Sequence, residues 1–207
     1  IELFPELIEQ NPELSGLNVT IPYKELVIPF LHKIDPTARE INAVNTIKIL
    51  RKDKKTYLKG FNTDITGFGN SLKPFLRNDI RKALILGTGG ASKAIKYVLN
   101  NLNISYKVLS RTPGNDKIGY REIDEDIVKS HLLIINCTPL GTFPDIQKCP
   151  DIPYHHLTDK HVLYDLVYNP DETLFLKKGK EKGASIKNGL EMLQIQAEAA
   201  WDIWTDL

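Results

Sequence analysis

A glycine-rich turn between an apolar run and an amphipathic stretch constrains the fold of this chain more than any other feature. Residues 82–86 are Lys-Ala-Leu-Ile-Leu, a short apolar run suited to a strand buried on both faces of a sheet. Glycines follow at Gly87, Gly89 and Gly90, and apolar side chains then recur at helical spacing over residues 91–102. The order of strand, glycine turn and helix predicts the beginning of a parallel α/β unit.

The same alternation continues through the second half of the chain. The pattern predicts a helix over 173–182 and further strands over 106–110, 132–135, 161–168 and 184–187. Because parallel neighbours need long, right-handed crossovers, the fold class is α/β with a doubly wound parallel sheet. We assign residues 67–188 to this Rossmann-type domain.

The first half of the chain is less regular. Residues 17–21 and 43–49 have the composition of strands, 24–34 reads as a helix, and 52–55 forms a polar hairpin tip. A terminal helix runs from beyond Gly189 through Trp204, and its apolar stripe comprises Met192, Leu193, Ala197, Ala200, Trp201 and Trp204. Since this stripe is too wide for a solvated helix, we expect it to pack back on the N-terminal region. Residues 1–66 and 189–207 would then form a smaller, discontinuous α/β domain that binds substrate.

Composition excludes several classes of function. The 207 residues carry 27 Lys and Arg against 26 Asp and Glu, so charge gives no reason to expect nucleic acid or an anionic membrane as a partner. Apolar runs fall short of the roughly 18 residues that a spanning helix needs. The five histidines show no metal-ligand spacing, so no metal is expected. Cys137 and Cys149 suit a reduced pair in a cytoplasmic protein, with a single disulfide as the alternative.

The glycine turn has the features of a dinucleotide site. Gly87 permits a tight turn, Gly89 lets the backbone approach a pyrophosphate, and the helix N-terminus supplies free N–H groups. Ser92 takes the third position of the usual pattern, where small Ala91 and Ala94 allow close helix–strand packing instead. The alternative is a glycine turn without a ligand.

The residues after the second strand favour NADP over NAD. NAD enzymes place an acid there for the ribose 2′-hydroxyl, whereas this chain has Ser110, Arg111 and Thr112. A guanidinium flanked by hydroxyls suits a 2′-phosphate. The alternative is a solvated surface arginine.

Two ionisable residues stand out by their place in the chain. Lys24 lies just past a predicted strand, in a turn that Pro22 stiffens, and Asp64 lies at another strand end where a helix begins. Either could be an ordinary solvated charge, and Asp64 could equally be a helix N-cap.

Five motifs, in order, resemble the shikimate dehydrogenase family. They are Gly-Leu-Asn-Val-Thr-Ile-Pro-Tyr-Lys (16–24), Ala-Val-Asn-Thr (43–46), Gly-Phe-Asn-Thr-Asp (60–64), the glycine turn (87–91) and Asn-Gly-Leu-Glu-Met-Leu (188–193). The resemblance implies that Lys24 and Asp64 are the catalytic pair. It implies that Thr20, Asn45 and Gln196 bind the hydroxyls of a small polyhydroxylated cyclohexene carboxylate, with Tyr168 on the substrate side where the domains face each other. The cofactor residues that it implies are Gly87, Thr88, Gly89, Gly90, Ala91, Ser110, Arg111, Thr112, Thr138, Leu166 and Gly189.

The residues make independent sense of that chemistry. Ketone reduction needs a hydride on carbon and a proton on oxygen, and a Lys24 ammonium could stabilise the developing alkoxide and act as the acid. Asp64 would hold the lysine and accept a hydrogen bond from a substrate hydroxyl. Gln196 lies with Met192, Ala199 and Ile203 on a largely apolar flank, where its amide needs a partner; a backbone group is the alternative to a substrate. Cys137, in a loop that resembles the family's loop near the nicotinamide ribose, is expected to be a filler rather than a nucleophile.

One departure from the family concerns the substrate carboxylate. The family holds it with a Ser-x-Ser pair near the N-terminus, and the residues before Gly16 show only Ser15. The chain opens without methionine, so we expect an N-terminally trimmed protein that lacks the first strand of its N-terminal sheet, binds NADP and binds substrate poorly.

These observations predict reversible, NADPH-dependent reduction of 3-dehydroshikimate to shikimate, in the biosynthesis of chorismate and aromatic amino acids. The expected partner is a small molecule, and the expected state a monomer or homodimer. The alternatives are a quinate/shikimate dehydrogenase using NAD, a non-catalytic regulatory relative that binds NADP, and a two-domain NADP enzyme acting on a folate or aminoacyl substrate. An acid in place of Ser110 and Arg111 would favour the first, loss of Lys24 or Asp64 the second, and the 18–24 motif argues against the third.

Overall fold

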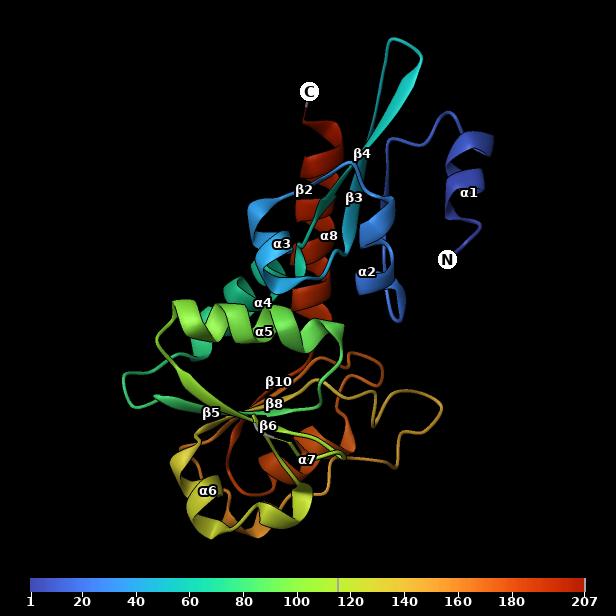
Figure 1. The fold of residues 1–207 in the computed structure, drawn as a ribbon. Helices are drawn as coiled ribbons and strands as arrows, with labels where there is room; N and C mark the ends of the chain where they lie inside the picture. Colours follow the sequence, from blue (N-terminus) through green and yellow to red (C-terminus); the bar gives the residue numbers. More distant parts are fainter. Residues whose placement is uncertain (115, 207) are drawn as a thin grey trace.

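A six-stranded parallel sheet organises the second half of the chain in the computed structural model, which describes residues 1–114 and 116–206 (Figure 1). Its spatial order is β10-β9-β8-β5-β6-β7, and every neighbouring pair is parallel. The strands are β5 (Lys82–Leu86), β6 (Ser105–Leu109), β7 (Lys117–Ile118), β8 (Leu133–Asn136), β9 (Val162–Asp165) and β10 (Ser185–Lys187). The predicted doubly wound sheet is confirmed, and the short strand β7 adds to it.

Helices cover both faces of this sheet, which is why its central strands read as continuous apolar runs. Ala83 and Ile85 of β5 face the core beneath α4 (Asp64–Leu72) and α5 (Gly90–Asn101). Leu84 and Leu86 face the opposite core, beneath α6 (Glu125–Ser130) and α7 (Leu174–Lys180).

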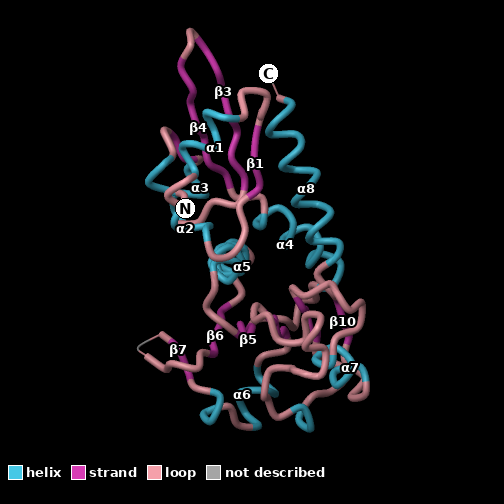
Figure 2. Tube along the Cα trace, turned by 90° about the vertical axis from the view of Figure 1, so that its right-hand side faces the viewer, coloured by secondary structure: helices cyan, strands magenta, loops and turns pink. Residues whose placement is uncertain are grey.

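A second, four-stranded sheet forms the other half of the molecule, in the order β1-β3-β4-β2. Its strands are β1 (Gly16–Asn18), β2 (Lys33–Ile34), β3 (Thr46–Lys52) and β4 (Lys55–Phe61). Asp53 and Lys54 adopt positive φ at the tip of the β3–β4 hairpin, where the polar tip was predicted. On one side of the sheet lie α1 (Phe4–Gln10), α2 (Tyr23–Leu26) and α3 (Pro36–Ile41), and on the other lies α8 (Leu190–Thr205) (Figure 2).

Helix α8 packs on the first half of the chain, as predicted, but with a different flank from the predicted stripe. Met192 and Ala200 are buried, and the Trp204 indole donates to the Ile47 carbonyl at 3.0 Å. Leu193, Ala197 and Trp201 are exposed, so half of the predicted stripe was wrong. The buried flank instead follows Met192, Gln196, Ala199, Ala200 and Ile203, the series that carries the glutamine.

The predicted helix over 24–34 is also wrong. The chain forms α2, then a 3₁₀ turn at Ile28–Phe30, and then β2. Pro29 lacks the N–H that a longer helix would need at this position. After Leu31 turns extended, the His32 amide donates to the Leu58 carbonyl, which brings the segment into the sheet.

Helix α4 connects the two halves and contacts both α5 and α8. A Cβ added at Gly67 would lie 2.6 Å from the Met192 carbonyl oxygen and 3.0 Å from the Gln196 Cβ. Glycine is therefore required for α4 and α8 to approach this closely, and the approach places Gln196 beside the first turn of α4.

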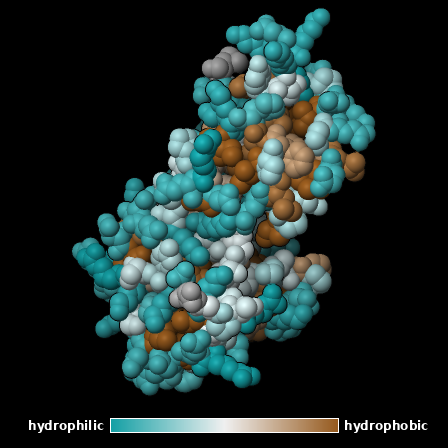
Figure 3. Space-filling model, viewed as in Figure 1, coloured by the Kyte–Doolittle hydropathy of each residue, from teal (hydrophilic) through white to brown (hydrophobic). Residues whose placement is uncertain are grey.

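The surface of the smaller half is more apolar than that of the larger half in the view of Figure 3. Exposed large apolar side chains in residues 1–66 include Leu3, Leu7, Ile21, Tyr23, Leu26, Leu50 and Tyr57. Within the described residues, none of the helices has both the length and the apolar character needed to cross a membrane.

Candidate active site

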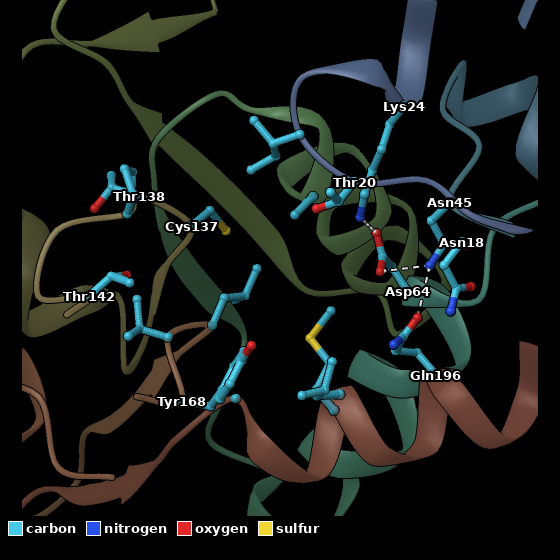
Figure 4. A pocket seen from close by; sticks show the side chains of 18 of the residues that line it. Asn18, Thr20, Lys24, Asn45, Asp64, Cys137, Thr138, Thr142, Tyr168 and Gln196 are labelled. Carbon is cyan, nitrogen blue, oxygen red and sulfur yellow. Dashed lines mark hydrogen bonds and ion pairs between the residues drawn. The ribbon is translucent and has the colours of Figure 1, made fainter. Parts of the chain in front are cut away.

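A cavity of about 570 Å³ lies between the two sheets, and both halves of the chain line it (Figure 4). The smaller half contributes mostly polar residues: Asn18, Thr20, Lys24, Asn45, Asp64 and Gln196, with Val19, Ile21, Met192 and Leu193 among them. The larger half contributes Ala91, Cys137, Thr138, Pro139, Thr142, Leu166, Val167, Tyr168, Asn169 and Gly189. The predicted catalytic and substrate residues thus share one cavity with four of the predicted cofactor residues.

Lys24 and Asp64 form an ion pair at the wall of this cavity. The Lys24 Nζ lies 2.5 Å from the Asp64 Oδ2, and the two side chains are only 13% and 7% exposed. Lys24 lies in α2, directly after a turn in which the Tyr23 amide donates to the Thr20 carbonyl. Asp64 is the first residue of α4, and Thr63 takes the N-cap position, so the N-cap alternative for Asp64 is wrong.

A polar network holds the other oxygen of Asp64. The Asn45 Nδ2 donates to the Asp64 Oδ1 at 2.9 Å, and it lies 3.0 Å from the Thr63 Oγ1 and 3.2 Å from the Gln196 Oε1. The Asn45 Oδ1 accepts from the Thr63 amide at 2.7 Å. Gln196 is therefore bound through side chains rather than through the backbone, and three distant segments meet at the carboxylate.

The glycine turn leads into the helix whose first turn lines the cavity through Ala91. Gly87 has a φ of +103°, and a Cβ built there would lie 2.9 Å from the Thr138 Cγ2, so the turn is packed against the loop after β8. A Cβ at Gly89 would meet nothing within 4 Å, whereas one at Gly90 would lie 3.6 Å from the Lys24 side chain. Among the residues that the structure describes, no side chain forms a capping hydrogen bond at the N-terminus of α5. The turn thus presents open space and uncapped backbone beside Lys24, which suits an anionic group.

Ser110, Arg111 and Thr112 follow β6 and lie outside the lining of the cavity. Arg111 and Thr112 are exposed, and the Thr112 amide donates to the Ser110 Oγ at 3.1 Å. The Gly87 amide donates to the Leu109 carbonyl, so this segment leaves the sheet next to the glycine turn. The geometry therefore allows one extended ligand to span the turn and Arg111.

Three polar lining residues, Asn18, Thr142 and Asn169, were not among the predicted site residues. Asn18 belongs to the 16–24 motif and accepts from the Thr46 hydroxyl at 3.4 Å, so its motif could have indicated it. Thr142 lies in the loop after β8, where spacing gave no signal.

Cys137 also lines the cavity. Burial raises the pKa of the Cys137 thiol, which keeps the thiol neutral and agrees with a filler at the cavity wall. Both cysteines are free thiols.

Across the described ranges 1–114 and 116–206, no group of three or more His, Cys, Asp and Glu side chains is arranged to hold a metal ion. The groups available for chemistry at the cavity are the amine of Lys24, the carboxyl group of Asp64, the neutral thiol of Cys137, and hydroxyls and amides.

Comparison with known proteins identifies relatives over most of the chain. A family model, the shikimate dehydrogenase substrate binding domain, matches residues 2–47. A shikimate dehydrogenase (NADP(+)) of Halothermothrix orenii is 38% identical, and the match covers 100% of this chain and 80% of the relative. A chorismate mutase/shikimate 5-dehydrogenase fusion protein from Clostridium acetobutylicum superposes with a TM-score of 0.86 at 38% identity, covering 100% of this chain and 77% of that one. Shikimate 5-dehydrogenase from Thermus thermophilus, solved with NADP(H) and shikimate, gives a TM-score of 0.84 at 31% identity, covering 100% and 79%.

Proposed function

Because this chain belongs to the shikimate dehydrogenase family, we propose that it catalyses the reversible, NADPH-dependent reduction of 3-dehydroshikimate to shikimate. The observation that carries this proposal is the Lys24–Asp64 pair, which lies in a cavity that also reaches the helix of the glycine turn. A polyol substrate suits the polar wall that Asn18, Thr20 and Asn45 provide.

The residues around the glycine turn fit a dinucleotide. Open space at Gly89 and the uncapped start of α5 would receive the pyrophosphate, and Arg111 with its hydroxyl neighbours would bind a 2′-phosphate. Thr138, Leu166 and Gly189, all three of which line the cavity, would hold the nicotinamide end. When bound, the nicotinamide supplies or accepts the hydride.

Lys24 has the position of the proton-transferring group. Its ammonium would donate a proton to the oxygen of the reacting carbonyl and stabilise the negative charge that develops there. Asp64 would orient the ammonium through its Oδ2, while Asn45 fixes the Oδ1. In the oxidative direction the same pair would take the proton from the hydroxyl of shikimate, so proton transfer in both directions depends on one contact.

The remaining parts of the proposal concern the setting of the enzyme. We infer a small-molecule partner, a cytoplasmic location and a monomer or homodimer. The arginine at 111, in place of an acid, favours NADP over NAD and argues against the quinate and NAD alternative.

One assay matrix tests the proposal. Purified protein is incubated with shikimate or quinate and with NADP or NAD, and reduced cofactor is followed at 340 nm, about the wavelength at which reduced nicotinamides absorb. We expect turnover with shikimate and NADP, and a loss of NADP preference in Arg111→Ala but not in Arg77→Ala, an exposed arginine that binds Asp79. Activity with quinate and NAD alone would overturn the substrate and cofactor assignment.

A further inference from the structure

Two buried polar residues end neighbouring strands directly beneath the cofactor side of the cavity. Asn136 is the last residue of β8 and Asp165 the last of β9, and the two are partners in the parallel register. Both are completely buried. The Asn136 Nδ2 donates to the Asp165 Oδ1 at 2.9 Å. Burying a carboxylate lowers the stability of the folded protein unless hydrogen bonds compensate for the lost hydration. The partners of these hydrogen bonds therefore indicate what the pair holds in place.

Each member of this pair holds the loop that follows its own strand. The Asn136 Oδ1 accepts from the Thr138 amide at 3.0 Å and from the Thr138 hydroxyl at 2.6 Å. The Asp165 Oδ1 accepts from the Val167 amide at 3.0 Å. Thr138 and Val167 both line the cavity, although neither Asn136 nor Asp165 does. The pair thus fixes two cavity-lining loops from behind.

A third contact anchors the pair to the far side of the sheet. The Asp165 Oδ2 accepts from the Thr173 hydroxyl at 2.6 Å, and Thr173 is the completely buried N-cap of α7. On the cavity side, Thr138 contacts the position that a Cβ at Gly87 would occupy. The chain of contacts therefore runs from α7 through Asp165 and Asn136 to Thr138 and the glycine turn.

We propose that Asn136 and Asp165 are positioning residues that set the two loops, 137–142 and 166–169, against which the nicotinamide end of the cofactor binds. This inference rests on the proposed function for the identity of the ligand. Asn136 and Asp165 neither line the cavity nor bond to Lys24 or Asp64, so they act through Thr138 and Val167. A pair kept only for stability would have no need to satisfy one amide in each of two cavity loops.

The test uses four variants of the whole protein. Asn136→Ala removes the link between the loops, and Thr173→Val removes the anchor without touching the cavity. Thr173→Ser keeps the hydroxyl and should restore wild-type behaviour. The matched control is Tyr164→Phe, which removes a buried hydrogen bond to Ser71 at 2.6 Å on the same strand as Asp165 but on the opposite face.

The first readout is hydrogen exchange in the protein without cofactor. We expect the Thr138 and Val167 amides to exchange about 10-fold faster in Asn136→Ala and Thr173→Val, and the strand amides to keep their protection. The second is titration with NADPH, in which Kd should rise about 5-fold or more in both variants. In the steady state, KM for NADP should rise more than KM for shikimate.

Unchanged loop exchange and NADPH affinity in both Asn136→Ala and Thr173→Val, with only a lower Tm, would overturn the proposal. The same holds if Tyr164→Phe weakens NADPH binding as much as they do. Because exchange is measured without cofactor or turnover, it decides on the loops even if the wild-type protein fails to oxidise shikimate. Such a failure would count against the proposed function alone.

Discussion

Lys24 reaches the cavity from a short helix, and a single carboxylate holds its ammonium there. The motifs were enough to single out Lys24 and Asp64, since both follow strand ends and Lys24 also follows a stiff turn. They could not predict that Asn45 and Gln196 meet beside the second oxygen of Asp64, because side chains separated by 19 and 151 positions in the sequence come together only through packing. The sequence thus singled out the two charged residues that pair in the cavity, but not the contacts of the side chains that surround them.

Replacing Lys24 by Met should lower kcat for shikimate oxidation by about 100-fold or more, since general acid–base catalysis contributes on that scale. The side chain keeps most of its length, and so the fold and the NADPH affinity should change little. Initial rates and an NADPH titration would check this. Lys33→Met, an exposed lysine on β2, serves as the control. A Lys24→Met enzyme with the wild-type rate would remove Lys24 from the mechanism.

Asp165 should give the protein a distinctive pH dependence of stability. Burial raises the pKa of this carboxyl to about 6 from 3.8, against the lowering effect of its hydrogen bonds from Thr173, Val167 and Asn136. Between these two values the folded protein keeps a proton that the unfolded chain has lost, so the free energy of unfolding should fall as pH rises through this window. The free energy of unfolding should fall by about 3 kcal/mol in total, and the fall should level off above about pH 6.

Urea unfolding of the wild type and of Asp165→Asn over this pH range measures the effect. The difference in the free energy of unfolding between the wild type and Asp165→Asn should shrink as pH rises. The facing titratable groups are Cys137 and Tyr154, whose pKa values are raised by burial, so neither titrates in the window. Parallel pH profiles for the two proteins would contradict the prediction.

Among the elements, the parallel sheet was predictable because buried strands and glycine punctuation leave a strong local signal. The stripe on α8 was only half right for a physical reason: apolar residues at 192, 193, 197 and 201 fit a helical period, but period alone does not say which flank meets the sheet. Gln196 marked the true flank, since its amide needed buried partners. The helix predicted over 24–34 failed because Pro29 outweighs helical spacing.

The approach of α4 and α8 gives a matched pair of substitutions on one helix. Gly67→Ala should lower the free energy of unfolding by about 2 kcal/mol, because its Cβ would lie 2.6 Å from the Met192 carbonyl oxygen. Gly69→Ala should raise it by up to about 1 kcal/mol, because its Cβ meets only Val98 at 3.7 Å and alanine favours helix. Urea midpoints would show the opposite signs. Equal effects would mean that α4 and α8 are not closely packed in solution.

At the scale of the whole molecule, Lys93 links the helix that follows the glycine turn to the segment that carries Lys24. Its Nζ lies 2.8 Å from the Glu25 Oε2 and donates to the Asn42 carbonyl at 3.2 Å. Lys93 belongs to α5, and Glu25 directly follows Lys24. This link could not be predicted from the sequence, because the relative placement of the two halves has no local signature.

Lys93→Gln should therefore lower turnover more than stability. An exposed ion pair contributes at most about 1 kcal/mol, so Tm should move little. The loss should show as a several-fold lower kcat. The kcat of the variant should also respond less to added salt, because salt weakens this ion pair in the wild type, whereas the variant has no such pair to weaken. Lys129→Gln breaks an exposed pair with Glu125 within α6 and is the control. A kcat equal to that of the control would show that the bridge has no role in turnover.

The packing of α8 also has a consequence for how the protein is made. A ribosome delivers this helix only after every strand of both sheets has emerged, yet the helix covers the Ile47 carbonyl and the Gly67 face of segments synthesised long before. Until α8 emerges, those surfaces lack the helix that covers them in the folded protein, and the Asn45 amide lacks its contact with Gln196. A nascent chain that has already formed its parallel sheet thus still lacks the side of the cavity that Gln196 lines.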